Sequence, residues 1–186
     1  MRWLLALLPC LLFISAAAAQ QESAIPRADA VVKPQAYVSL EPVPRGRAFE
    51  VAVVAEIRQG FHVNSHQPTE EFLIPTTLTA QLPSGFREVG TVYPLGEMLK
   101  FSFSPSPLSV YTGSVTLILR IEAAANAPLG PQSIPMGLRY QACNDTTCLP
   151  PVKIPVEAKL TVASAGTPAK NTHPEIFSSG KSQPKK

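Results

Sequence analysis

Two cysteines, Cys143 and Cys148, are the residues of this sequence best suited to chemistry. They flank four polar residues, 144–147, and cysteines that flank a short turn can face each other on paired strands at the Cα separation of about 5.5 Å that a disulfide requires. The segments on either side have strand-like compositions, so the pair is predicted at the tip of a β-hairpin.

This spacing admits three chemical interpretations. As a structural bridge, the pair closes a loop of about six residues and contributes on the order of 2 kcal/mol, a modest gain for a domain of this size. As a redox couple, a single local disulfide in an oxidising compartment is more easily reduced than a structural disulfide that joins distant strands. As a metal site, the two thiolates could be joined by His62 and His66, but residues four apart on a strand are separated by about 13 Å. The redox interpretation is favoured, and no metal or cofactor is predicted.

The rest of the sequence predicts the strands that must position this pair. The alternation in residues 48–57 places Phe49, Val51, Val53, Ala55 and Ile57 on one face, a period of two that is typical of strands. Further strands are predicted at residues 37–40, 60–66, 76–82, 86–93, 109–121, 133–143 and 152–162, separated by Pro, Gly, Ser and Asn. Twenty prolines argue against long helices. The predicted fold is all-β, an immunoglobulin-like antiparallel β-sandwich.

The two ends of the sequence differ from its middle. Residues 1–19 resemble a signal peptide, with a basic start, an apolar run and an Ala-x-Ala end, which predicts export to the periplasm. Residues 20–34 are expected to form a polar leader, 35–162 the sandwich, and 163–186 a disordered basic tail. Without Arg2, 15 Lys and Arg remain against 13 Asp and Glu, so no nucleic-acid partner is expected. Nor is stable membrane insertion expected, because no later apolar stretch is long enough to span a bilayer.

Several motifs resemble one known family. They are Gly60-Phe61-His62-Val63-Asn64-Ser65, Pro75-Thr76-Thr77-Leu78, Val110-Tyr111-Thr112-Gly113, and above all Tyr140-Gln141-Ala142-Cys143 with Cys148-Leu149-Pro150-Pro151. Together they are similar to the amino-terminal periplasmic domain of DsbD, a thiol:disulfide interchange protein, over residues 35–162. The loop between the cysteines has four residues here and five in the best-known members of the family.

The resemblance implies roles for individual residues. Cys148 would attack partner disulfides and Cys143 would resolve the mixed disulfide. His62 and Asn64, on the strand expected beside the hairpin, and Tyr140 would contact a sulfur or a partner. The family's cap loop would correspond to residues 96–107, where Met98, Phe101 and Phe103 are candidates for the residue that covers the disulfide, although Phe101 and Phe103 could equally be core residues.

The implied function is a dithiol relay with oxidoreductase-type activity. Its partners would be thioredoxin-like periplasmic proteins and a membrane electron transporter of DsbD type, with secreted or cytochrome-maturation thiol proteins as clients. Full-length DsbD continues into a membrane domain and a second thioredoxin-like domain that this sequence lacks, so we expect a detached module. A binding or assembly domain with a structural hairpin bridge is the alternative, and a copper-binding chaperone is the third possibility.

Overall fold

The computed structural model describes residues 25–178, so the predicted signal peptide lies outside the described residues. Within this range strands dominate, and the helices are one 3₁₀ turn, η1 (Ala28–Ala30), and one short helix, α1 (Pro174–Ser178). The strands are β1 (Val32–Val38), β2 (Leu40–Glu41), β3 (Val43–Pro44), β4 (Arg47–Ile57), β5 (His62–Asn64), β6 (Thr77–Ala80), β7 (Phe86–Val92), β8 (Glu97–Leu99), β9 (Leu108–Tyr111), β10 (Ser114–Ala123), β11 (Gly130–Tyr140), β12 (Ala142–Cys143), β13 (Val152–Ala163) and β14 (Lys170–Asn171).

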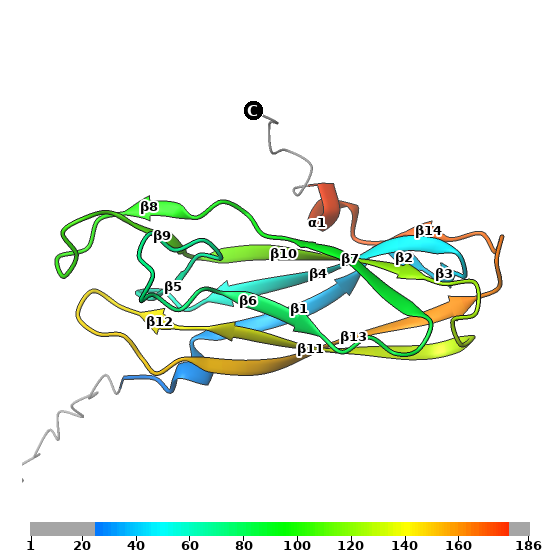
Figure 1. The fold of residues 1–186 in the computed structure, drawn as a ribbon, viewed down its shortest axis with the longest axis horizontal. Coiled ribbons are helices and arrows are strands. Elements are labelled where there is room, and N and C mark those ends of the chain that lie inside the picture. The colour runs from blue at the N-terminus through cyan, green and yellow to red at the C-terminus, as the bar shows by residue number, and fades with distance from the viewer. Residues whose placement is uncertain (1–24, 179–186) are drawn as a thin grey trace, which may run out of the picture.

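Two four-stranded sheets form an immunoglobulin-like β-sandwich, as predicted (Figure 1). One sheet has the order β1-β4-β10-β7 and the other the order β3-β13-β11-β6. The pairings are antiparallel except that of β3 with β13, which is parallel. Long neighbours such as β11 and β13, paired from Gly130–Val162 to Tyr140–Val152, give the sandwich its length.

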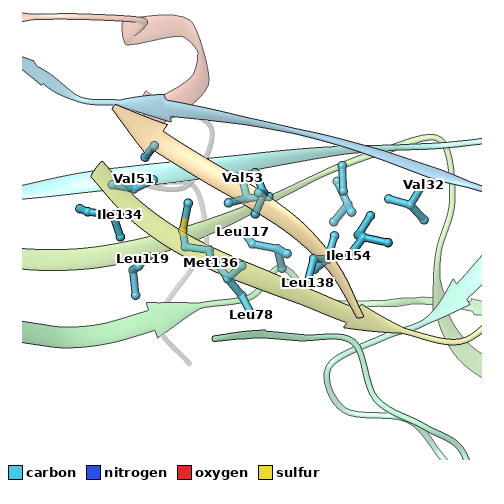
Figure 2. Close-up of a cluster of buried hydrophobic side chains, with 14 of the residues drawn as sticks. Val32, Val51, Val53, Leu78, Leu117, Leu119, Ile134, Met136, Leu138 and Ile154 are labelled. Carbon is cyan, nitrogen blue, oxygen red and sulfur yellow. The ribbon is translucent and has the colours of Figure 1, made fainter. Parts of the chain in front are cut away.

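The core between the sheets follows the predicted alternation. Phe49, Val51, Val53, Ala55 and Ile57 of β4 are all buried in one cluster. Alternate residues of β10, the neighbour of β4 in the same sheet, and of β11 and β13 in the facing sheet join this cluster, among them Leu117, Leu119, Ile134, Met136, Leu138 and Ile154 (Figure 2). Each fully buried aliphatic side chain of this kind stabilises the fold by roughly 1.5–3 kcal/mol.

A third, smaller sheet, β12-β5-β9-β8, lies at one end of the sandwich. It forms because two predicted strands are each divided in two. Residues 109–121 are interrupted at Gly113, whose φ of 59° turns the chain between β9 and β10. Residues 133–143 are divided at Gln141, after which the chain leaves β13 and pairs with β5. The cysteine hairpin is therefore carried by the end sheet and continues directly from the core strand β11.

The folded part extends beyond the predicted boundaries at both ends. Val31 and Val32 are buried in the core, so residues 31–34 belong to the sandwich and not to a polar leader. The expectation of a disordered tail is wrong for residues 163–178. There β14 pairs with β2, and Phe177 of α1 packs against Ala52 and Ile118 on the outer face of the first sheet. The apolar residues Ile176 and Phe177 pack in this cluster and hold the segment on the sheet. The overall composition of the segment is basic, so it did not predict this packing.

Candidate functional site

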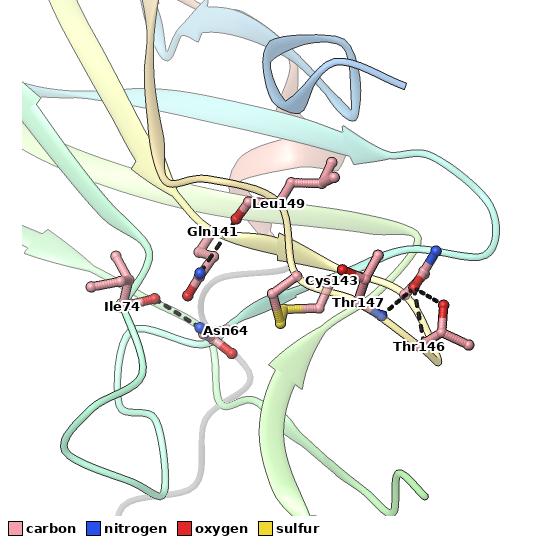
Figure 3. Close-up of a disulfide and its surroundings, with 9 residues drawn as sticks. Asn64, Ile74, Gln141, Cys143, Thr146, Thr147 and Leu149 are labelled. Atoms are coloured by element: carbon pink, nitrogen blue, oxygen red, sulfur yellow. Dashed lines mark hydrogen bonds between the residues drawn. A yellow bond between two sulfur atoms is a disulfide. The ribbon is translucent and has the colours of Figure 1, made fainter. Parts of the chain in front are cut away.

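Cys143 and Cys148 form a disulfide across the predicted hairpin (Figure 3). Their Cα atoms are 4.0 Å apart, and the two residues form an antiparallel bridge. Backbone hydrogen bonds lie on either side of the bridge, from Asn144 N–H to Thr147 O (2.9 Å) and from Leu149 N–H to Ala142 O (2.8 Å). The cysteines thus occupy a non-hydrogen-bonded position of the ladder, where opposing residues come closest.

The two cysteines differ in their access to solvent. Cys143 lies on β12 and is 2% exposed, whereas Cys148, on the returning limb of the hairpin, is exposed. A docked thiol can therefore reach Cys148, while Cys143 lies behind it. The bridge is therefore asymmetric, with one exposed and one buried cysteine. The rate of disulfide exchange depends on access to the sulfur that is attacked.

The loop between the cysteines is organised by Asn144. Its Oδ1 accepts hydrogen bonds from the backbone N–H of Thr146 (3.0 Å) and of Thr147 (2.8 Å), and from the Thr146 hydroxyl (3.1 Å). At the base of the hairpin, the Gln141 amide donates to Leu149 O (3.3 Å). The sequence indicated polar turn residues here, but it did not single out Asn144. The signal available was an Asn at the start of a tight loop, where its side chain typically replaces a backbone acceptor. The hairpin therefore has its own hydrogen bonds in addition to the disulfide.

Asn144→Ala is expected to lower the free energy of unfolding by about 1–2 kcal/mol, because two backbone donors lose their acceptor at once. Thermal unfolding of the oxidised protein measures this loss. Thr146→Val is the matched control, since it removes only the hydroxyl bond to Asn144 and should cost well under about 1 kcal/mol. Equal losses for the two variants would show that the backbone bonds contribute nothing.

Three stacked rings lie beside the hairpin. We call His62, Phe101 and Phe103 the ring stack: the His62 and Phe101 centroids are 4.1 Å apart at 24°, and those of Phe101 and Phe103 are 5.3 Å apart at 17°. His62 is paired with Cys143 in the β5–β12 register, which places the inner end of the stack next to the disulfide. Phe101 is 9% exposed and Phe103 is 48% exposed, so the stack runs from the buried cysteine to the surface.

The predicted cap segment, residues 96–107, is only partly extended. Its first part is β8, where Met98 is 57% exposed and is paired with Ser109, and the remainder is a turn that carries Phe101 and Phe103. Of the three cap candidates, Phe101 is the one in ring contact with a neighbour of the cysteines, and Phe103 covers it.

Asn64 and Tyr140 are buried and have partners within the protein. The Asn64 amide donates to Ile74 O (3.0 Å), and the Tyr140 hydroxyl donates to Ala28 O (2.6 Å). Burial raises the pKa of Tyr140 to about 12, so its hydroxyl stays protonated and remains a donor. Tyr140 is 0% exposed, and in this conformation its visible role is to tie β11 to η1. Ala28 could not be anticipated as its partner, because it falls in the predicted leader.

The electrostatic surroundings of the site include one carboxylate and one buried imidazole. Burial lowers the pKa of His62, and the negative charge of Asp145 in the hairpin loop raises it, the burial effect being the larger. His62 and Asp145 line the same open groove, together with Arg58, Phe101 and Thr112. Within residues 25–178, no group of three or more His, Cys, Asp and Glu side chains is arranged to hold a metal ion.

The comparison with protein families decides what kind of site this is. The profile of the family described as "Thiol:disulfide interchange protein DsbD, N-terminal" matches residues 27–159. The chain belongs to this family. Its DsbD N-terminal domain therefore takes part in thiol:disulfide exchange, and it has a cysteine pair joined at disulfide distance. In this family the domain is periplasmic, and residues 25–178 contain no helix long and apolar enough to cross a membrane.

Two solved structures are similar to this DsbD N-terminal domain. The reduced DsbD N-terminal domain of Neisseria meningitidis is 17% identical, with a TM-score of 0.45, and the match covers 81% of this chain and 97% of that one. The full-length major pilin SpaD of Corynebacterium diphtheriae is 9% identical, with a TM-score of 0.39, over 69% of this chain and 35% of the pilin. Comparison with curated protein sequences gives no match.

Proposed function

We propose that this domain relays electrons in the periplasm through the Cys143–Cys148 pair. Electrons would come from a thioredoxin-like protein or a membrane transporter of DsbD type and pass to secreted or cytochrome-maturation thiol proteins. The observation that carries the proposal is the unequal exposure of two bonded cysteines, with Cys148 exposed and Cys143 buried, on a hairpin of a thiol:disulfide interchange family.

The relay runs in two balanced steps. A partner thiolate attacks the Cys148 sulfur, forms a mixed disulfide and releases Cys143 as a thiolate. A second partner thiolate then attacks the mixed disulfide, leaving the domain with two thiols and the donor with a disulfide. To reduce a client, Cys148 attacks the client disulfide, and Cys143 then attacks Cys148 and restores the internal bridge.

The ring stack supports a role as a cap for residues 96–107. Phe101 lies over His62, the residue paired with Cys143, and the exposed ring of Phe103 is available to a docking partner. Displacement of the stack on docking would uncover the buried Cys143 side of the disulfide to that partner. The exposed side chain of Met98 would join the partner contact, whereas Asn64 and Tyr140 would hold the strands beneath the site.

The reduction potential distinguishes this relay from a binding domain with a structural bridge. We expect a potential above about −300 mV, in the range of exchange proteins, since structural disulfides lie below that value. The measurement is equilibration of the domain with dithiol redox buffers of known potential, followed by thiol alkylation. A potential well below about −300 mV would favour the structural interpretation, in which the bridge only reinforces the hairpin.

A further inference from the structure

His62 Nε2 is a buried nitrogen without a hydrogen-bond partner among the described residues. His62 is 4% exposed, so its contact with bulk solvent is small. Buried polar atoms in folded proteins almost always have a partner, and an exception at a functional site calls for an explanation. A partner that forms only when the disulfide is reduced would account for it.

Cys143 is the residue directly opposite this imidazole. Paired residues of neighbouring antiparallel strands project from the same face of the sheet, with Cβ atoms about 4.5–5.5 Å apart. The Cys143–His62 pairing therefore brings the Cys143 sulfur and the imidazole to one face. In the disulfide the sulfur carries no hydrogen. Reduction creates an S–H donor at Cys143, and a thiol is the kind of weak donor that a neutral imidazole nitrogen accepts.

The charges around His62 are few. Asp145 of the hairpin loop and Arg58 line the same groove, and Phe101 covers one face of the imidazole. Burial holds the pKa of His62 below its ordinary value, so at neutral pH the ring is uncharged and able to accept a proton. Asp145 acts in the opposite direction and stabilises the imidazolium once it has formed.

We propose that His62 is the base that takes the proton of the Cys143 thiol when Cys143 resolves a mixed disulfide. This inference rests on the proposed function. The Cys143 S–H proton passes to His62 Nε2, and the Cys143 thiolate attacks the Cys148 sulfur. The Cys143–Cys148 bond forms, the bond between Cys148 and the partner sulfur breaks, and the partner leaves as a thiolate. The two cysteines are oxidised, the partner disulfide is reduced, and the imidazolium returns its proton to solvent.

The wild-type protein provides the first test. The reduced domain is mixed with a chromogenic aromatic disulfide, which releases one aromatic thiolate when Cys148 is captured and a second when Cys143 resolves the adduct. We expect the rate of the second release to be level above about pH 7 and to fall as the pH drops through the His62 pKa, below about 6.5. A second-release rate that keeps rising with pH until a free thiol ionises, at about pH 8.5, would overturn the proposal.

His62→Gln provides the second test. At about pH 7 the second release should slow at least about tenfold, a conservative value for loss of a general base. The difference should disappear at about pH 10, where a thiol ionises without help. His66→Gln is the matched control: the His66 Nδ1–H donates to Thr76 O and the ring stacks on Tyr93, contacts that do not involve the cysteines, and the variant should retain the wild-type profile. Equal slowing of His62→Gln at every pH would indicate a purely structural role and overturn the proposal.

The two releases also separate this inference from the relay itself. If the wild-type protein shows no first release, the Cys148 thiol does not exchange, and the proposed function fails. If both releases occur and the His62→Gln profile matches that of the wild type, the relay stands and the role of His62 is refuted.

Discussion

Cys148→Ser is expected to reduce disulfide exchange to the rate of the protein-free reaction. In the proposed relay the exposed cysteine, Cys148, is the one that a partner reaches. The remaining Cys143 is 2% exposed, so it should not replace Cys148 in the reaction with a docked thiol or disulfide. The measurement is turnover of glutathione disulfide by the dithiol-treated domain. A serine hydroxyl cannot replace the thiolate, because it does not ionise in this pH range.

Cys143→Ser is the matched variant, and its expected result is different. Cys148 remains free to attack glutathione disulfide, but the mixed disulfide cannot be resolved and should accumulate as a one-to-one adduct visible by mass spectrometry. If Cys148→Ser forms the glutathione adduct and Cys143→Ser does not, the roles of the two cysteines are the reverse of those proposed. If neither variant forms the adduct, the disulfide has no exchange function.

Leu138→Ala is expected to produce the largest loss of stability, about 2–5 kcal/mol, because it removes a buried isobutyl group from a packed core. Leu138 is 1% exposed on β11 and is paired with Ile154 on one side and Leu78 on the other. The loss should appear as a fall in Tm of roughly 2–4 °C for each kcal/mol, measured by thermal unfolding of the oxidised protein.

Leu129→Ala makes the same chemical change at the turn before β11, where the leucine is 50% exposed. The expected loss there is within about 0.5 kcal/mol, as for most surface positions. Because β11 leads directly into the cysteine hairpin, a partly unfolded Leu138→Ala protein should also be reduced faster. Similar Tm values for the two variants would mean that Leu138 does not lie in the core.

The sandwich could be predicted because the alternation of apolar residues along its strands shows which face of each strand is buried. On β4, every second residue from Phe49 to Ile57 is apolar and is buried. The cysteine hairpin was also predictable, since a four-residue polar loop between two strand-like segments leaves the cysteines few other arrangements. The strands follow from a period of two and the hairpin from contacts between residues close in sequence. A single sequence displays both directly.

The surroundings of the disulfide depend on distant pairings, which the sequence does not display. Nothing in the sequence around His62 indicates that it is buried, because its neighbours there come from β12 and from the turn at Phe101. Histidine and asparagine are seldom fully buried, yet His62 and Asn64 are both buried here. The order of residues 163–178 was missed for the same reason: a basic, proline-containing segment gains its stability from β2 and from the outer face of β4 and β10.

The two ends of the described part of the domain lie on different parts of the sandwich, which matters for any experiment that fixes the protein to a support. Ala28 is hydrogen-bonded to Tyr140, three residues before Cys143, whereas α1 packs on the outer face of the β4–β10 layer (Figure 1). An affinity label or resin linkage placed on the carboxyl side of Ser178 would leave the hairpin unobstructed. One placed before Ile25 would begin near the strand that carries it, and could itself hinder the approach of large redox proteins.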